Sequence, residues 1–275
     1  MNKYTLNQFT VMKQNCERIV ASTACDATQA RIISKNGVEL ILVGDSLGVT
    51  VAGYTTTIPV TMEQMVYHIE CVARGNQGGF IMGDMPFMSY FDIRTALKNA
   101  AKLMRSGAES VKLEGGAWLA DIVYELQKNG IPVCGHLGLS PQSVFTKGYK
   151  VYIGETEKKQ IINDAQILEE AGIQMLLLKC VHHEIAKEIS ELLKIPVIGI
   201  GAGRYCDGQI LILHDLLGFN CEESVLFQYK HDTGVQPKSH VRDFLKTSKD
   251  GIAGAIRDYA DSVKSLDFPN ENEIY

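Results

Sequence analysis

The sequence has few of the features that mark disulfide-bonded, zinc-binding or nucleic-acid-binding proteins. It contains no CxxC pair, and its seven cysteines are odd in number and widely scattered, so we interpret them as reduced thiols. It also has no basic excess, since 27 Lys and Arg face 32 Asp and Glu for a formal net charge of −5. We therefore predict that neither nucleic acid nor an anionic membrane surface is its main partner.

Long apolar runs are missing too. No stretch approaches the ~20 apolar residues that span a bilayer, and the first residues, MNKYTLNQFTVMKQ, lack the apolar region of a secretory signal. We therefore expect a cytoplasmic protein. What the chain does have is 45% hydrophobic residues over 275 positions, a share that allows a large buried core.

Short β-rich runs alternate with longer segments of helical period. Most of these runs are almost continuously apolar, as expected for parallel strands covered on both faces. The predicted strands are Ile19–Thr23, Leu40–Ser46, Phe80–Phe87, Ser110–Glu114, Val133–His136, Met175–Cys180, Val197–Gly201 and Ile210–His214. About eight strand–helix units in ~250 residues predict an α/β fold of the closed (β/α)₈ TIM-barrel type. An open doubly wound sheet is the alternative.

Local signals place several helix ends between these strands. Thr61 and Gln64 have the spacing of a capping box at the start of one helix. Asp92 is placed to cap the next helix. The pair Ser140–Pro141 is typical of an N-cap followed by a first-turn proline.

The end of the chain is predicted to extend the barrel. Residues 239–266 have the pattern of one or two extra helices, and we expect the polar end, 268–275, to be frayed. Because no repeat, low-complexity tract or linker interrupts the sequence, we predict a single domain over residues 1–275.

Acidic residues stand at the carboxyl ends of three successive predicted strands. They are Asp45, Asp84 and Glu114. In a barrel these ends converge on one mouth, where active sites are built. Neighbouring buried carboxylates repel and become protonated unless a cation neutralises them, and oxygen ligands without nearby His or Cys suit Mg²⁺ better than Zn²⁺. We therefore predict a divalent metal site, although Asp45 and Asp84 could each be helix caps.

Other polar residues stand near the same strand ends. Lys112 lies within an apolar strand, where it could bind a substrate carboxylate, stabilise an enolate or simply pair with Glu114. His136 could contact substrate or be a satisfied core histidine. The glycines of GIGAG (199–203) lack dinucleotide-binding spacing and would let a ligand approach the backbone, whereas the turn at 182–184 is predicted to be solvated.

Several stretches of the chain together resemble ketopantoate hydroxymethyltransferases, in order and in spacing, from about Thr23 to Gly218. They are LVGDSLGVTVAGYTTTIPVT (42–61), GDMPFMSY (83–90), GAESVKLEGG (107–116), IPVCGHLGLSPQS (131–143) and IPVIGIGAGRYCDGQILILHD (195–215). The resemblance implies a barrel of the phosphoenolpyruvate-mutase-like type and a homo-decamer. It also implies transfer of a hydroxymethyl group from 5,10-methylenetetrahydrofolate to 3-methyl-2-oxobutanoate, which gives 2-dehydropantoate for pantothenate biosynthesis.

The resemblance also implies roles for individual residues. By position, it makes Asp45 and Asp84 the Mg²⁺ ligands and places Glu114 in or beside the metal shell. It makes Ser46 and Lys112 contacts to the keto acid, and it puts His136 in the same pocket. These roles agree with the chemistry, because Mg²⁺ chelated by the keto acid and the charge of Lys112 would both stabilise an enolate.

One position departs from the family pattern at the chemical step. Lys179 stands where the family has a glutamate, proposed as the general base, and a protonated lysine cannot accept the C3 proton. Further departures are Cys25 for a tyrosine, His182 for a proline and an altered segment at 150–154. We interpret the chain as the hydroxymethyltransferase, with altered pH dependence or reduced rate.

Two alternatives follow from Lys179. One is a related metal-dependent enzyme that makes or breaks C–C bonds beside a keto acid, with Lys179 repurposed for a Schiff base. The other is a keto-acid-binding paralogue without catalysis.

Overall fold

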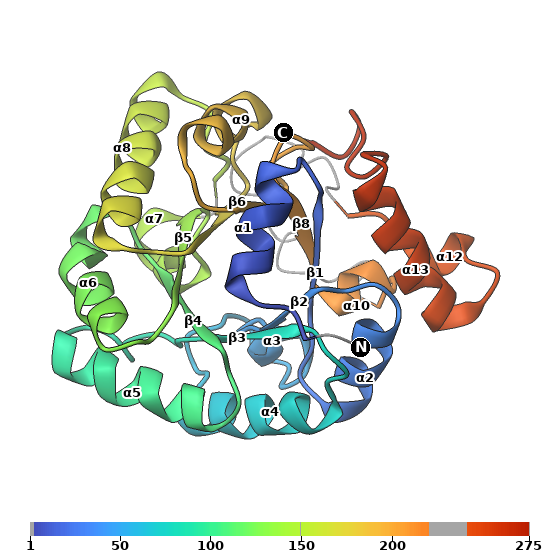
Figure 1. The fold of residues 1–275 in the computed structure, drawn as a ribbon, viewed down its shortest axis with the longest axis horizontal. Coiled ribbons are helices and arrows are strands. Elements are labelled where there is room, and N and C mark those ends of the chain that lie inside the picture. The colour runs from blue at the N-terminus through green and yellow to red at the C-terminus, as the bar shows by residue number, and fades with distance from the viewer. Residues whose placement is uncertain (1–2, 149, 220–240, 275) are drawn as a thin grey trace.

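A closed barrel of eight parallel strands forms the centre of the computed structural model, which describes residues 3–148, 150–219 and 241–274 (Figure 1). The strands follow the chain order around the barrel without a crossover. They are β1 (Ile19–Thr23), β2 (Leu40–Val43), β3 (Phe80–Asp84), β4 (Ser110–Glu114), β5 (Val133–Gly138), β6 (Met175–Lys179), β7 (Val197–Ile200) and β8 (Gly208–Leu211). The predicted TIM barrel is confirmed, and the open sheet is excluded.

Several predicted strand ends were wrong, because apolar runs continue past the ladder. The second run ends at Val43 rather than at Ser46, since the chain turns there into a short helix. The third ends at Asp84 rather than at Phe87, because Pro86 lacks a backbone N–H and its carbonyl accepts a turn hydrogen bond from Ser89. The eighth strand begins at Gly208, two residues before the predicted start, and ends at Leu211.

Helices surround the barrel and alternate with its strands (Figure 1). Those before β6 are α1 (Leu6–Gln14), α2 (Ala27–Lys35), α3 (Leu47–Thr50), α4 (Met62–Gly75), α5 (Ile93–Arg105), η1 (Ala117–Leu119), α6 (Ala120–Lys128), η2 (Pro141–Ser143), α7 (Val144–Lys147) and α8 (Glu155–Ala171). Those after it are α9 (His183–Leu192), α10 (Leu213–Leu216), α12 (Phe244–Thr247) and α13 (Gly251–Lys264). Among the described residues, no helix is both long and apolar enough to cross a membrane.

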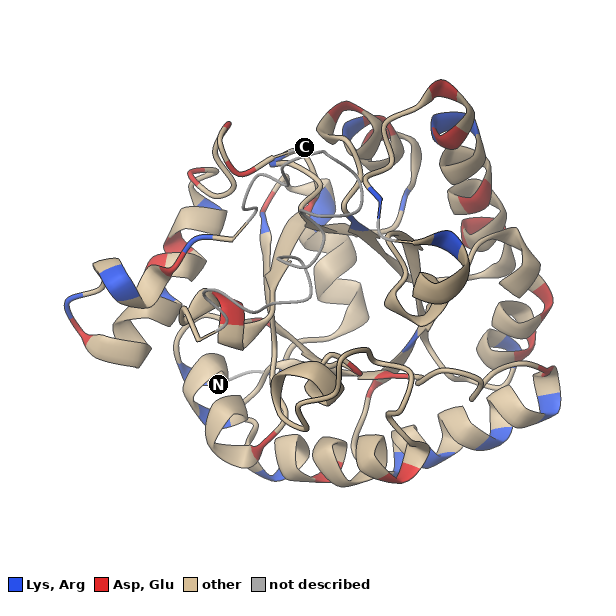
Figure 2. Cartoon of the chain, turned by 180° about the vertical axis from the view of Figure 1, so that it is seen from behind, with Lys and Arg blue, Asp and Glu red and all other residues tan. Residues whose placement is uncertain are grey.

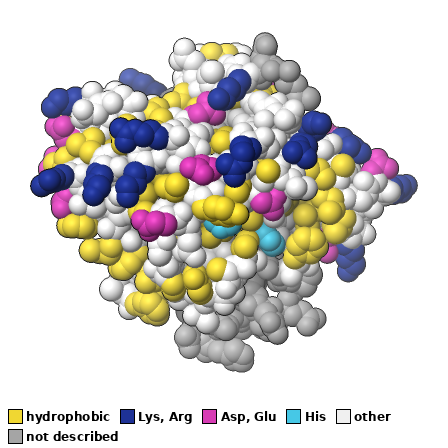
Figure 3. All heavy atoms as spheres, turned by 90° about the horizontal axis from the view of Figure 1, so that it is seen from below, with side chains coloured by type: hydrophobic (Ala, Val, Ile, Leu, Met, Phe, Trp, Pro, Cys, Tyr) yellow, Lys and Arg dark blue, Asp and Glu magenta, His cyan; other side chains and the backbone are white. Residues whose placement is uncertain are grey.

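Sequence-encoded caps begin several of these helices. The capping box of α4 is confirmed, with Thr61 and Gln64 bonded to each other's backbone N–H groups. Asp92 caps α5 by accepting a hydrogen bond from Thr95 N at 2.7 Å. Helix α5 buries one face and exposes the other. The side of the molecule on which α5 and α4 lie carries a row of Lys and Arg side chains among hydrophobic ones (Figure 3).

The two ends of the barrel differ in chemistry. Helix α1 lies across the amino end of the strands (Figure 1), where Phe9 and Met12 pack into the apolar cluster that fills the barrel interior. The opposite end is left for polar side chains, and charged residues lie on the barrel strands as well as on the outer helices (Figure 2). A site can therefore form only at the carboxyl end of the barrel.

The carboxyl-terminal helices pack against the barrel, and the prediction of a frayed end was wrong for residues up to 274. Phe268 is buried against the rings of Phe244 and Tyr259, with centroids 5.6 and 5.8 Å away. Arg242 pairs with Glu273 at 2.8 Å. The polar composition of this segment did not indicate that Phe268 would be buried or that Glu273 would pair with Arg242.

None of the cysteines that the structure describes forms a disulfide, and Cys221 lies outside the described residues.

Candidate active site

The alternation of side chains along the strands brings charged groups into the barrel mouth. On β3, Phe80 and Met82 belong to the interior cluster, so Asp84 two residues later faces inward as well. The same alternation on β6 leads from Leu177 to Lys179. Strand register sets these groups side by side, because Asp84 pairs with Lys112 across β3 and β4.

Three buried carboxylates meet at this mouth. Oxygens of Asp45, Asp84 and Glu114 all lie within 4.8 Å of one another. The backbone N–H of Asp45 donates to Asp84 Oδ2 at 3.1 Å, which fixes the first two together. The sequence therefore identified three residues that the fold brings to one point, and neither aspartate serves only as a helix cap.

Lys112 lies within this cluster and is 3% exposed. Its Nζ is 2.9 Å from both Asp84 Oδ1 and Glu114 Oε1. The ion pair with Glu114 that the sequence suggested is present, and a second pair with Asp84 accompanies it. Lys112, and after it His136, outweigh the effect of burial and hold the pKa of Glu114 well below its usual range.

The remaining carboxylates lack enough positive charge. Burial raises the pKa of Asp84 well above its usual range, against the opposing effect of Lys112. Burial and the nearby Glu114 also raise the pKa of Asp45. Three carboxylates and one ammonium leave an excess of two negative charges, which one divalent cation would balance. The donor set of hard oxygens fits Mg²⁺.

His136 borders the same cluster. Its Nδ1 lies 3.1 Å from Glu114 Oε1 and 3.3 Å from Lys112 Nζ. Burial lowers its pKa, which favours the neutral ring. Within the part of the chain that the structure describes, its buried Nε2 has no hydrogen-bond partner. A satisfied core histidine would not leave that nitrogen unpaired, so the ring has one polar atom available for a ligand.

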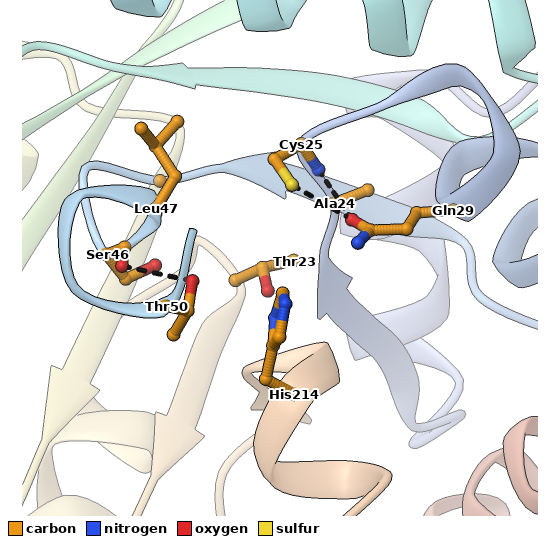
Figure 4. Close-up of a pocket in the computed structure, with 9 residues that line it drawn as sticks. Thr23, Ala24, Cys25, Gln29, Ser46, Leu47, Thr50 and His214 are labelled. Atoms are coloured by element: carbon orange, nitrogen blue, oxygen red, sulfur yellow. Dashed lines mark hydrogen bonds between the residues drawn. The ribbon is translucent and has the colours of Figure 1, made fainter. Parts of the chain in front are cut away.

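Ser46 borders a neighbouring hollow between the ends of β1 and β2, lined also by Thr23, Gln29, Thr50 and His214 (Figure 4). The Thr50 hydroxyl donates to the Ser46 carbonyl at 3.2 Å. Because Ser46 directly follows Asp45, this hollow opens next to the carboxylates.

Cys25 lines the same hollow, and its thiol donates to Gln29 Oε1 at 3.2 Å (Figure 4). Burial raises the pKa of this thiol to about 11, so it stays protonated and unreactive at neutral pH.

Comparison with known proteins assigns the chain to a family. The model of a family described as "Ketopantoate hydroxymethyltransferase" matches residues 3–271. The chain belongs to the ketopantoate hydroxymethyltransferase family. A 3-methyl-2-oxobutanoate hydroxymethyltransferase of Marinobacter nauticus is 48% identical over 98% of both chains, and one of Buchnera aphidicola is 43% identical over the full length of both. The predictions of this family, of an enzyme and of hydroxymethyltransferase function are confirmed.

Solved structures with low sequence identity share the fold. A 2,3-dimethylmalate lyase of the PEP mutase/isocitrate lyase superfamily has a TM-score of 0.58 at 14% identity and covers 84% of this chain and 89% of its own. A phosphoenolpyruvate phosphomutase from Streptomyces platensis has a TM-score of 0.60 at 11% identity, covering 84% and 88%. The predicted phosphoenolpyruvate-mutase-like type of barrel is thereby confirmed.

Lys179, the predicted site residue on β6, also lies at the barrel mouth. It ends β6, opposite Gly138 of β5, and is half-buried. Burial has the largest effect on the pKa values of Asp45 and His136, and the charge of Lys179 lowers both. In the described residues, its ammonium group makes no ion pair or hydrogen bond. An unpaired cation therefore faces the mouth of the site.

Sequence reasoning missed three polar residues that hold the cluster in place. Ser140 was interpreted as a helix cap, but it makes no capping bond, and its hydroxyl donates to Glu114 Oε2 at 2.7 Å. Gln142 and Tyr90 are buried beside it and bond to each other at 2.7 Å. The only local signal was their position in loops after β5 and β3, because nothing in the sequence shows that these loops fold inward.

Packing requires glycine at two positions of the glycine-rich segment 199–203. A Cβ at Gly203 would lie 2.4 Å from the Cβ of His183, at the start of α9, and one at Gly199 would lie 2.9 Å from Cys206 Sγ. The expectation that these glycines admit a ligand stays a prediction.

Proposed function

We propose that the chain transfers a hydroxymethyl group from 5,10-methylenetetrahydrofolate to C3 of 3-methyl-2-oxobutanoate. The product is 2-dehydropantoate, a precursor of pantothenate. The observation that carries this proposal is the trio of buried carboxylates, of which Lys112 pairs with only two, at the barrel mouth of a chain from this family. We further propose that the enzyme is a homo-oligomer, a decamer by family resemblance, which light scattering can test.

The proposed site divides its work among residues on four strands. Asp45 and Asp84 would hold Mg²⁺, with Glu114 in or beside its shell. Bound Mg²⁺ would act as a Lewis acid that stabilises negative charge developing on the keto oxygen. Lys112, held by its two carboxylate partners, adds a fixed positive charge in a site from which water is largely excluded.

The remaining groups would orient the keto acid. His136 Nε2 is the unpaired ring nitrogen that faces no protein partner in the described residues, and it would hydrogen-bond a polar atom of the substrate. Ser46, at the border of the adjacent hollow, would contact the keto acid from the other side.

Lys179 is the proposed proton acceptor only as a neutral amine. As an ammonium it has no lone pair, so the C3 proton cannot be removed by this group.

A second candidate function follows from the same lysine. Its amino group makes no ion pair in the described residues, and beside the proposed keto-acid site it would form a Schiff base with the substrate carbonyl. The amine nitrogen would attack the carbonyl carbon, and water would leave. Borohydride would reduce the resulting imine to a stable secondary amine, so mass spectrometry of the peptide that contains Lys179 tests this candidate.

Exchange of the C3 proton tests the proposed function directly. In D₂O, the enzyme with Mg²⁺ should replace the C3 proton of 3-methyl-2-oxobutanoate by deuterium, without any folate, and the ¹H signal should disappear. Exchange should stop when the metal is chelated. Tight keto-acid binding without exchange at any pH would instead support a binding paralogue.

Loss of Lys112 should affect both binding and stability. Lys112→Ala should raise KM for the keto acid and lower kcat, because it removes a fixed positive charge from the site. It should also lower the free energy of unfolding of the metal-free protein by about 3–5 kcal/mol, since two buried carboxylates lose their partner. Steady-state kinetics and denaturant unfolding measure the two effects.

Lys128 supplies the control for Lys112→Ala. It pairs with Glu125 at the surface, with 57% of its side chain exposed, so Lys128→Ala should change neither quantity appreciably. Normal kinetics in Lys112→Ala, combined with the loss of stability, would reduce Lys112 to a structural ion-pair partner.

A further inference from the structure

Gln142 bonds to two of the three carboxylates of the cluster, one through its side chain and one through its backbone. It lies in η2, just after β5, and is 6% exposed. Its Nε2 donates to Asp45 Oδ2 and to the Met85 carbonyl, each at 2.9 Å. Its Oε1 accepts from the Tyr90 hydroxyl at 2.7 Å, so every part of the amide is engaged.

The backbone of Gln142 contacts the cluster as well. Its N–H donates to Glu114 Oε2 at 3.2 Å, beside the Ser140 hydroxyl that donates to the same oxygen. A single residue thus bonds one oxygen of Asp45, on the loop after β2, and one oxygen of Glu114, at the end of β4. Asp84 completes the trio through the backbone N–H of Asp45.

These contacts permit only one orientation of the amide. Nε2 faces two acceptors, and Oε1 faces a hydroxyl donor, so flipping the group would place its oxygen against a carboxylate and a carbonyl. Tyr90 is itself fixed, because the Glu114 N–H donates to its hydroxyl at 3.3 Å and its ring stacks on Trp118. The hydrogen bonds therefore form a closed network around the carboxylates.

We propose that Gln142 is a positioning residue for the metal site. By binding Asp45 Oδ2 and Glu114 Oε2, it turns the opposite oxygen of each carboxylate toward the space shared with Asp84. This inference rests on the proposed function, because Gln142 acts through residues proposed to hold Mg²⁺. Outer groups that orient ligands in this way typically contribute about 10–100-fold to metal affinity.

An amide is needed at this position rather than a carboxylate. A glutamate would have the same shape, but it would offer no donor to Asp45 or to the Met85 carbonyl when ionised, and it would add a fourth negative charge. Gln142→Glu thus removes the donors at constant shape, whereas Gln142→Met removes them without adding charge. Comparing the two variants separates the effect of losing the hydrogen bonds from the effect of the added negative charge.

Calorimetric titration with Mg²⁺ alone, on the full chain, tests the proposal. Gln142→Met should bind Mg²⁺ about 10–100-fold more weakly than the wild type, and Gln142→Glu should bind it more tightly than Gln142→Met, because the added carboxylate attracts the cation. The matched control is Gln209→Met, since Gln209 is also buried but its Nε2 donates to the Gly203 carbonyl instead. This control should retain wild-type Mg²⁺ affinity.

A double-mutant comparison distinguishes positioning from general support of the fold. In an Asp45→Asn background, adding Gln142→Met should change Mg²⁺ affinity much less than it does in the wild type, because its main target is already lost. If the Gln142 variants do not fold, Tyr90→Phe provides the test, since it removes the hydroxyl that donates to Gln142 Oε1 and accepts from the Glu114 N–H. It should weaken Mg²⁺ binding in the same direction.

Each outcome has a distinct reading. Wild-type Mg²⁺ affinity in folded Gln142→Met, or in Tyr90→Phe where the Gln142 variants do not fold, would overturn the positioning role and leave the proposed function standing. Equal weakening in Gln209→Met would also overturn it, because any buried amide would then have the same effect. Absence of Mg²⁺ binding by the wild type would overturn this inference together with the proposed metal site.

Discussion

Asp45→Asn and Asp84→Asn should each weaken Mg²⁺ binding by more than the roughly 10–100-fold that loss of an outer orienting group costs. Each change removes one of three buried carboxylates and reduces the excess of negative charge from two units to one. Binding of the keto acid should weaken in parallel, because the metal would chelate it. Calorimetry with Mg²⁺, and then with keto acid at saturating Mg²⁺, measures both effects.

The matched control for these variants is Asp258→Asn on the exposed face of α13, which should leave Mg²⁺ affinity unchanged. Unchanged Mg²⁺ affinity in both site variants would remove Asp45 and Asp84 from the metal site.

Asp45→Asn should weaken metal binding but increase the stability of the metal-free protein. Burial raises the pKa of Asp45, so the folded state holds a proton that the unfolded chain releases above its ordinary pKa of about 3.9. Stability is therefore lost as pH rises from that value toward the raised pKa. Asp45→Asn removes this loss, so its free energy of unfolding should exceed that of the wild type increasingly from pH 4 to pH 7. Denaturant unfolding in chelator at several pH values measures the difference.

These two effects belong together in a metal-binding site. Such carboxylates lower the stability of the metal-free protein, yet they are required for binding the cation. This combination indicates that they serve binding rather than folding. A helix-capping aspartate would behave differently, because its loss would destabilise the fold at every pH above its own titration.

The sequence predicted the barrel and the carboxylate cluster for the same physical reason. Parallel strands buried on both faces appear as apolar runs, and an acidic residue at the end of such a run has only the mouth to occupy. Asp84 and Glu114 follow this rule directly. The sequence could not show how loops fold back over the barrel mouth. Gln142 is the clearest case, because its partners Asp45 and Tyr90 are 97 and 52 residues away along the chain.

The prediction of a frayed carboxyl-terminal segment was wrong for a related reason. Phe268 stands in a polar stretch, and composition alone predicted a free end. Its partners Phe244 and Tyr259 become neighbours only after α13 has packed against the barrel. Contacts made by single anchors between distant elements leave no periodic trace in the sequence, unlike the faces of helices and strands.

Lys179→Glu should increase the rate of C3 proton exchange at neutral pH by ~10²–10⁴-fold, the usual contribution of a general base. The substitution replaces the ammonium at the end of β6 by the carboxylate that the family resemblance implies, close enough to affect the pKa values of Asp45 and His136. It also removes a cation next to the metal site, so Mg²⁺ should bind more tightly. The structural cost should be small, because the ammonium has no ion-pair partner in the described residues. Exchange in D₂O, with and without Mg²⁺, measures the gain.

Two further measurements assign the gain to the base rather than to charge. Lys179→Gln removes the positive charge without supplying a base, so it should raise Mg²⁺ affinity but leave exchange slow. Lys187→Glu, on the outer face of α9, changes charge by the same amount as Lys179→Glu and should alter neither.

The opposite pattern would identify a different chemistry at this residue. If Lys179→Glu lowers activity and Lys179→Gln abolishes it, then the amine itself reacts, and the Schiff-base function gains support. If both substitutions leave exchange unchanged, another group or water removes the proton, and Lys179 takes no part in the step. Only a large gain in Lys179→Glu, absent from Lys179→Gln, is consistent with a site in which metal, keto acid and Lys112 are in place and only the base is impaired.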